Sequence, residues 1–120
     1  MEYSIFIGRY QPLHDGHKKL IQTVIDEGKN VLVFLRDTGI NEQNPFGYEE
    51  RVEMFNKAFP QEILSGRVRV EMFPGVDIAE ICYGRKVGWG IRSIKLDEET
   101  ESISATEIRK NHEKFTKLRY

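Results

Sequence analysis

Short apolar runs alternate with longer amphipathic segments along this chain. Residues 4–7 and 31–35 are apolar almost throughout, which is typical of strands in the covered middle of a parallel sheet, and 68–72 alternates apolar with charged residues. Apolar positions recur at helical spacing over 17–25 and over 48–59. The pattern predicts strand, helix, strand, helix and strand, in that order.

The second half of the chain gives weaker signals. Pro74 ends the third strand, and we expect a short helix over 76–83, a fourth strand over 91–96 and a last helix from about residue 105. Strands that alternate with helices predict one domain over residues 1–120, an α/β structure with three layers and a doubly wound parallel sheet. Its ligand crevice is expected at the carboxyl ends of the strands, where the strand order reverses.

Composition limits what this domain can bind. The formal net charge of the 120 residues is −1, which argues against a nucleic-acid binder that works by neutralising phosphates. The single cysteine, Cys82, cannot form an internal disulfide, which favours a reducing compartment. No apolar run is long enough to span a bilayer, and the N-terminus lacks a signal-peptide pattern. We therefore expect a cytoplasmic protein that binds neither nucleic acid nor membranes; a pocket for a charged nucleotide needs only local charge.

The segment between the first strand and the first helix carries the first candidate chemistry. Gly8 lets the chain turn without a side chain blocking the crevice, and Gly16 permits the close approach of a ligand. His14 and His17 are three residues apart at a helix start, where free N–H groups and a partial positive charge favour an anion. Two unrelated histidines, or a zinc pair, are the alternatives; a single further histidine and a single cysteine make zinc the weaker one.

Residues 8–17 have the sequence G-R-Y-Q-P-L-H-D-G-H. This segment resembles the H-x-G-H signature of the nucleotidyltransferase superfamily, whose fold is Rossmann-like. Its lead-in is most similar to that of the nicotinamide-mononucleotide adenylyltransferases, whereas cytidylyltransferases usually carry a lead-in closer to G-T-F-D. The resemblance implies that His14 and His17 stabilise the α-phosphate of a nucleoside triphosphate. It also implies nucleotide contacts for Gly8, Arg9, Tyr10 and Gly16, with added positive charge from Lys18.

A second motif lies near the carboxyl end of the chain. Residues 103–109 have the sequence I-S-A-T-E-I-R, which resembles the family's I-S-[STG]-T-x-[IV]-R motif and departs from many relatives at Ala105. Ser104 also begins a helix-capping pattern. The resemblance implies nucleotide contacts for Ser104 and Thr106, and it implies that Arg109 holds the departing pyrophosphate.

Two further segments resemble the family less specifically. Residues 44–54, with the sequence N-P-F-G-Y-E-E-R-V-E-M, are similar to a stretch of the adenylyltransferases. Within it, Arg51 could bind phosphate or pair with a glutamate on an exposed helix face. Residues 84–89, G-R-K-V-G-W, are similar to a segment before the family's last strand, and Trp89 could stack on a ring or belong to the core.

The resemblance implies a reaction in which an oxygen of a phosphorylated acceptor attacks the α-phosphorus of a nucleoside triphosphate and pyrophosphate leaves, with Mg²⁺ bridging the phosphates. The motif spelling favours ATP and nicotinamide mononucleotide. The short chain favours the alternative, a cytidylyltransferase acting on glycerol 3-phosphate or a similar ester, and we give the spelling more weight. A nucleotide-binding module without turnover is the alternative from another class. Small relatives commonly pair as dimers, so a homodimer stays open.

Overall fold

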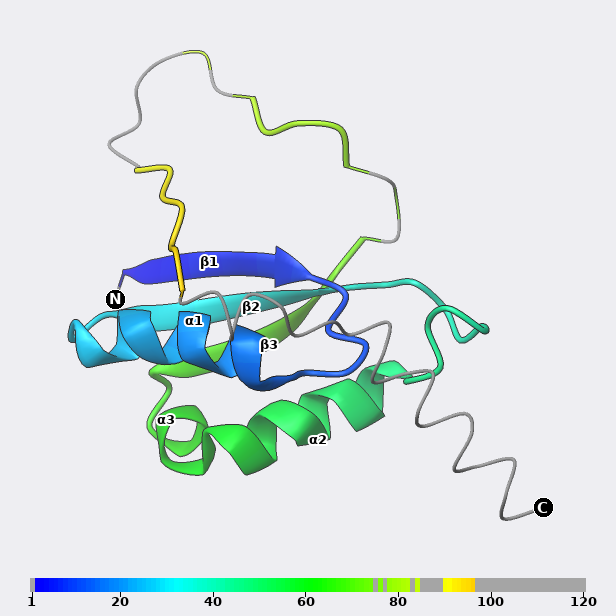
Figure 1. Ribbon diagram of the computed structural model, residues 1–120, viewed down its shortest axis with the longest axis horizontal. Coiled ribbons are helices and arrows are strands. Elements are labelled where there is room, and N and C mark those ends of the chain that lie inside the picture. Colours follow the sequence, from blue (N-terminus) through cyan, green and yellow to red (C-terminus); the bar gives the residue numbers. More distant parts are fainter. Residues whose placement is uncertain (1, 75, 77, 83, 85–89, 97–120) are drawn as a thin grey trace.

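The parallel α/β fold predicted from the sequence is confirmed. The computed structural model describes residues 2–74, 76, 78–82, 84 and 90–96 (Figure 1). Its elements are β1 (Tyr3–Gly8), α1 (Asp15–Asp26), β2 (Asn30–Arg36), α2 (Tyr48–Ala58), α3 (Pro60–Leu64) and β3 (Val68–Phe73). The three strands form one parallel sheet in the order β1-β2-β3, which is the first half of a Rossmann-like arrangement.

Helices α1 and α2 form where the apolar spacing predicts them. In α1 the buried apolar side chains are Ile21, Val24 and Ile25, and the chain leaves the helix through Gly28, whose φ of +80° favours glycine. The amphipathic stretch of α2 ends at Pro60 as expected. Pro60 also starts the short helix α3, which the sequence did not predict, because proline is well suited to the first turn of a helix.

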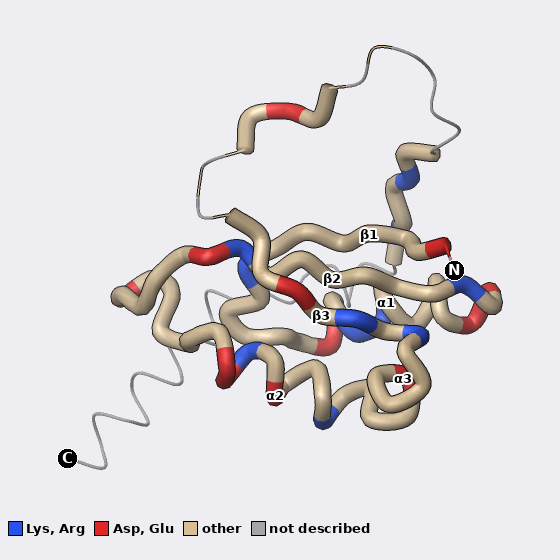
Figure 2. The backbone as a smooth tube through the Cα atoms, turned by 180° about the vertical axis from the view of Figure 1, so that it is seen from behind, with Lys and Arg blue, Asp and Glu red and all other residues tan. Residues whose placement is uncertain are grey.

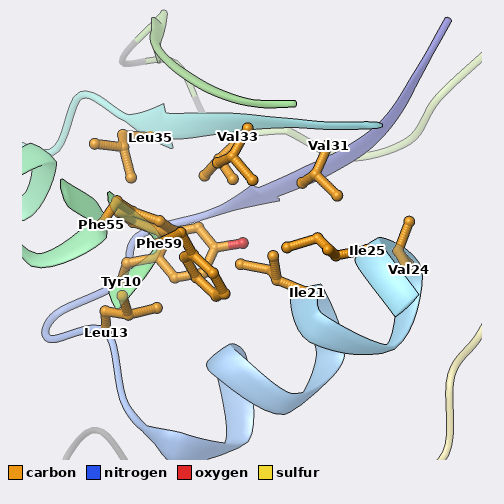
Figure 3. Close-up of a cluster of buried hydrophobic side chains, with 11 residues drawn as sticks. Tyr10, Leu13, Ile21, Val24, Ile25, Val31, Val33, Leu35, Phe55 and Phe59 are labelled. Atoms are coloured by element: carbon orange, nitrogen blue, oxygen red, sulfur yellow. The ribbon is translucent and has the colours of Figure 1, made fainter. Parts of the chain in front are cut away.

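The core lies between the sheet and the helices. Figure 3 shows Val31, Val33 and Leu35 of β2 on the side of the sheet that faces the helices, and all three are fully buried. Side chains of α1 and α2 belong to the same buried cluster, and α3 packs against it, so the three helices cover one face of the sheet. A consecutive strand order with right-handed crossovers places successive helices on the same side. The expected second helical layer and reversal of strand order are not among the described residues.

Two predicted elements of the second half are wrong. The described residues of 76–83 form no helix, and Ile91–Leu96 forms no strand. Side chains hold this last segment instead: Ile94 packs against the core, and Arg92 donates two hydrogen bonds to the Glu27 carboxylate. A short apolar run becomes a strand only where a neighbouring strand accepts its backbone hydrogen bonds, and the sequence does not show that partner. The last helix, predicted from about residue 105, lies outside the described residues.

Charged residues of both signs are interspersed along the described backbone (Figure 2). This distribution agrees with the near-neutral charge count of the sequence. Within the described part of the chain, none of the helices has the length and apolar character that crossing a membrane requires.

Phe55 tests the position of the core. Replacing this fully buried ring by alanine should lower the free energy of unfolding by about 3–5 kcal/mol, because the cavity is enclosed by packed side chains. Urea denaturation followed by circular dichroism measures the loss. Leu64→Ala is the matched control, since this α3 side chain is 89% exposed and its removal should change stability by less than about 0.5 kcal/mol. Equal losses in the two variants would contradict this core.

Candidate active site

The chain turns sharply between β1 and α1, and Tyr10 fills the turn. Tyr10 has a φ of 49° and is 7% exposed. A Cβ added to Gly8 would lie 3.0 Å from Cε2 of Tyr10, which is tighter than most Cβ contacts and would require the ring to shift. Glycine at position 8 therefore leaves room for the Tyr10 ring. The sequence predicted the same freedom at Gly8 but for an open crevice rather than for a packed ring.

His14 and His17 cap the start of α1 reciprocally. Nδ1 of His14 accepts hydrogen bonds from the backbone N–H groups of Gly16 at 3.1 Å and of His17 at 3.4 Å. In return, the backbone N–H of His14 donates to Nδ1 of His17 at 3.3 Å. The two rings are stacked, with centroids 3.7 Å apart and planes 19° apart. This is the geometry of a capping box with imidazoles in place of the usual hydroxyl and carboxylate.

The reciprocal cap decides which ring nitrogens carry protons. A nitrogen that accepts a hydrogen bond has its lone pair free of a proton, so the neutral form of each ring carries hydrogen on Nε2. Burial lowers the pKa of His17 to about 4, with a further lowering by neighbouring His14. Burial also lowers the pKa of His14, although the Asp15 carboxylate opposes this effect. At neutral pH the pair therefore offers two uncharged Nε2–H donors.

This arrangement corrects one expectation about the helix start. The sequence suggested that the free N–H groups of the first turn would meet an anion, but those of Gly16 and His17 already donate to His14. The partial positive charge of the helix N-terminus remains. The side-chain donors that the cap leaves for a ligand are the imidazole Nε2–H groups. Lys18 is exposed and lies 3.8 Å from the Asp15 carboxylate, so the local positive charge that it adds is partly offset.

Arg9 lies beside the loop that follows β2. Its Nη1 donates to Oδ1 of Asn44 at 3.4 Å, and Nδ2 of Asn44 in turn donates to Oδ1 of Asn41 at 3.0 Å. Asn44 is 8% exposed, whereas Arg9 is exposed. The buried amide therefore holds one edge of an accessible guanidinium next to the turn that carries Tyr10 and the two histidines.

Gln11 joins the same loop to the turn, and sequence reasoning missed it. The side chain is 1% exposed and exchanges two hydrogen bonds with the backbone of Phe46: Nε2 donates to the carbonyl at 2.8 Å, and Oε1 accepts from the N–H at 3.0 Å. The available signal was its place inside the first motif. A glutamine in a loop ordinarily faces solvent, so nothing local predicts this burial.

Arg51 does not lie on a solvated helix face, which was one of the two roles considered from the sequence. It is 2% exposed rather than on a solvated helix face, and its guanidinium donates to three backbone carbonyls: Nε to Gly47 at 3.3 Å, and Nη1 to Arg9 at 3.0 Å and to Arg36 at 2.8 Å. The first turn of α2 faces the carboxyl ends of β1 and β2, which directs the side chain inward. Burial lowers the pKa of Arg51, while the Asp37 carboxylate opposes this.

The other predicted site residues cannot be compared with this geometry. Ser104, Thr106, Arg109 and Trp89 lie outside the described residues. Their roles stay predictions. In the portion of the chain that is described, no three histidine, cysteine, aspartate or glutamate side chains are grouped so that they could hold a metal ion.

Known proteins contain segments that are similar in sequence to this part of the chain. Residues 5–68, which run from β1 to the start of β3, match the model of a family described as cytidylyltransferase-like. A protein named nicotinamide-nucleotide adenylyltransferase from Pyrococcus furiosus is 34% identical over 80 residues, which is 65% of this chain and 43% of that protein. The protein of the same name from Thermococcus sibiricus is 30% identical over 81 residues, 65% of this chain and 44% of its own length.

A third relative has a similar name. The nicotinamide/nicotinic acid mononucleotide adenylyltransferase of Acinetobacter baylyi is 36% identical over 63 residues, 51% of this chain and 34% of that protein. The chain thus spans less than half the length of these relatives. The family match over residues 5–68 covers the segment that carries the histidine pair, Arg9 and Arg51.

The half-buried His17 ring predicts a specific dependence of stability on pH. Its pKa in the folded state is about 4, below the usual value of 6.5, so between these values the unfolded chain binds a proton that the folded chain does not. The free energy of unfolding should therefore fall as the pH drops from 6.5 toward 4, and His14 acts in the same direction. Urea denaturation at a series of pH values measures this.

His17→Gln is the control, because glutamine does not titrate. Subtracting its curve from that of the wild type removes the shared effect of the carboxylates. The difference should be flat above about pH 7 and should fall below 6.5. Curves that run parallel down to pH 4 would contradict the lowered pKa.

Proposed function

Because this chain belongs to the cytidylyltransferase-like family, we propose that it is an adenylyltransferase. In this proposal it moves AMP from ATP to nicotinamide mononucleotide, or to a similar small phosphorylated acceptor, and releases pyrophosphate. The observation that carries the proposal is the reciprocal His14–His17 cap, which leaves both Nε2–H groups as donors at a helix N-terminus. The names of the relatives favour the adenylyl reaction over the cytidylyl alternative.

The histidine pair suits a reaction in which negative charge grows on phosphate oxygens. An acceptor phosphate oxygen attacks the α-phosphorus, the bond to the bridging oxygen breaks, and no side-chain nucleophile is needed. Two fixed N–H donors stabilise the developing charge without reorganising during the step. Stacking and capping hold the rings of His14 and His17 in place before the substrate arrives. Neutral rings also avoid the repulsion that two adjacent imidazolium ions would cause.

Positive charge in the site comes from residues around this pair. The exposed Arg9 guanidinium, held through Asn44, would contact the triphosphate, and Lys18 would add weaker charge. Ser104, Thr106 and Arg109 complete the proposal on the strength of the second motif, as binders of the nucleotide and the leaving pyrophosphate. Gly16 would let the nucleotide approach the helix start closely.

Mg²⁺ would enter this site with the triphosphate. Mg²⁺ is commonly held through substrate phosphates and water, which does not require a cluster of protein ligands. When bound, it would neutralise part of the phosphate charge. We further propose that the protein is cytoplasmic and that it forms a homodimer.

Two substitutions of His14 separate capping from chemistry. Asparagine is a strong helix N-cap but has no group in the position of Nε2–H, so His14→Asn should fold with little loss of stability and lose roughly 100-fold in kcat. His14→Leu should lose both the cap and the activity. Pyrophosphate release from ATP and from CTP is measured with nicotinamide mononucleotide, glycerol 3-phosphate and phosphopantetheine as acceptors.

His17→Ala should likewise abolish product formation without unfolding the domain. Wild-type turnover in either His14→Asn or His17→Ala would refute the assigned chemistry. Faster release from CTP than from ATP would favour the cytidylyl alternative. Nucleotide binding by the wild-type chain without pyrophosphate release from any acceptor would favour the non-catalytic module.

A further inference from the structure

We infer that Arg51 is a positioning residue of the site, which holds the His17 ring in place through the Arg9–Tyr10 peptide and the Tyr10 ring. The inference rests on the proposed function, because turnover is one of its readouts. It replaces direct phosphate contact with an indirect role for a side chain that is 2% exposed.

Arg51 joins three segments that meet at one edge of the sheet. Its guanidinium donates to the carbonyl of Arg9 just after β1, to that of Arg36 at the end of β2, and to that of Gly47 just before α2. Figure 1 shows the carboxyl ends of β1 and β2 and the start of α2 on the same side of the molecule. A single planar group therefore sets the spacing between the two strand ends from which the site is built.

The contact with Arg9 reaches His17 in two steps. The Arg9 carbonyl belongs to the peptide that leads into Tyr10, whose φ of 49° gives the turn its direction. The Tyr10 ring packs edge-on against His17, with centroids 4.7 Å apart, and against Phe55 at 5.1 Å. The ring also lies close to Gly8, where an added Cβ would be 3.0 Å from its Cε2 atom. The Tyr10 ring is enclosed by its neighbours. A shift of the Arg9–Tyr10 peptide would therefore move this ring against His17 and displace the imidazole.

Burying the guanidinium of Arg51 costs free energy, so we infer that its planar geometry is needed here. A guanidinium that leaves water loses hydration, and neutral carbonyls recover only part of it. Lysine carries the same charge at the end of a flexible stem, but it has no fixed fork to span carbonyls of different segments. Arg51→Lys therefore keeps the charge and removes the geometry that the inference requires.

Arg67 supplies a matched control within the same chain. Its Nη2 donates to the carbonyls of Ile25 at 2.9 Å and Lys29 at 3.0 Å, so it too joins separate backbone segments through a guanidinium. It precedes β3 at the opposite end of the sheet from the histidine pair. Arg67→Lys thus removes the same kind of bond at a place where the site does not depend on it.

The experiment compares Arg51→Lys with Arg67→Lys in the full chain. Stability is measured by urea denaturation, kcat and KM by pyrophosphate release, and the His14 and His17 ring nitrogens by NMR. We expect both variants to lose stability, and Arg51→Lys alone to lose kcat, by roughly 100-fold if the His17 ring shifts by about 1 Å, with KM for ATP little changed. The Nε2 signal of His17 should move in Arg51→Lys and stay in Arg67→Lys. Arg51→Ala, with guanidinium ion added at low concentration, should recover part of the lost kcat.

The outcomes separate this inference from the proposed function. If the wild-type chain releases no pyrophosphate, the function fails, and the His17 signal in the two lysine variants still decides the positioning role. An active Arg51→Lys variant with wild-type kcat and an unmoved His17 signal overturns the inference. Equal losses of kcat in both lysine variants, in proportion to lost stability, also overturn it, because they would show a structural role alone. If Arg51→Lys does not fold, Arg51→Ala with and without guanidinium ion decides by the same criteria.

Discussion

The candidate site depends on one constraint: the two nitrogens of each imidazole have different hydrogen-bonding roles. In His14 and His17 the Nδ1 atoms accept backbone hydrogen bonds at the start of α1, and this leaves Nε2–H as the donor. In the proposed function, capping and chemistry therefore belong to one pair of residues. Burial lowers the pKa of both rings. Protonation of the Nδ1 atom of either ring would in addition cost a capping bond. The same contacts that begin the helix thus keep the pair neutral.

Buried polar side chains fix the turn after β1 and the loop after β2, which surround this pair. Gln11 exchanges two hydrogen bonds with Phe46, Asn44 accepts from Arg9, and Arg51 donates to carbonyls of three segments. Most of their partners are backbone groups outside the regular ladder: the Arg9 and Arg36 carbonyls at the ends of β1 and β2, and backbone groups of Phe46 and Gly47 just before α2. Satisfying these groups with side chains from distant segments makes the loop after β2 and the turn after β1 one unit. A site on loops is held accurately when buried contacts of this kind support it.

Prediction from the sequence succeeded where local periodicity decides structure. The spacing of Ile21, Val24 and Ile25 predicts α1 because that face must be buried, and the apolar run of β2 predicts a covered strand. It failed over 91–96, where a strand needs a neighbour that no local pattern reveals. At the site, the sequence identified the histidine pair from its motif but not the reciprocal cap. It missed Gln11 and assigned Arg51 to solvent or phosphate.

The sequence by itself determined the order β1, α1, β2, α2 and β3, and it placed two histidines three residues apart at the start of a helix. It could do so because periodicity and helix geometry act over a few neighbouring residues. The tertiary structure decided which donors those histidines present. It also decided that Arg51 faces inward, since its acceptors Arg9 and Arg36 lie 42 and 15 residues away along the chain. Burial and hydrogen-bond partners over such separations arise only when β1, β2 and α2 pack together. For that reason a charged residue that looks like a ligand in the sequence supports the site from within the fold.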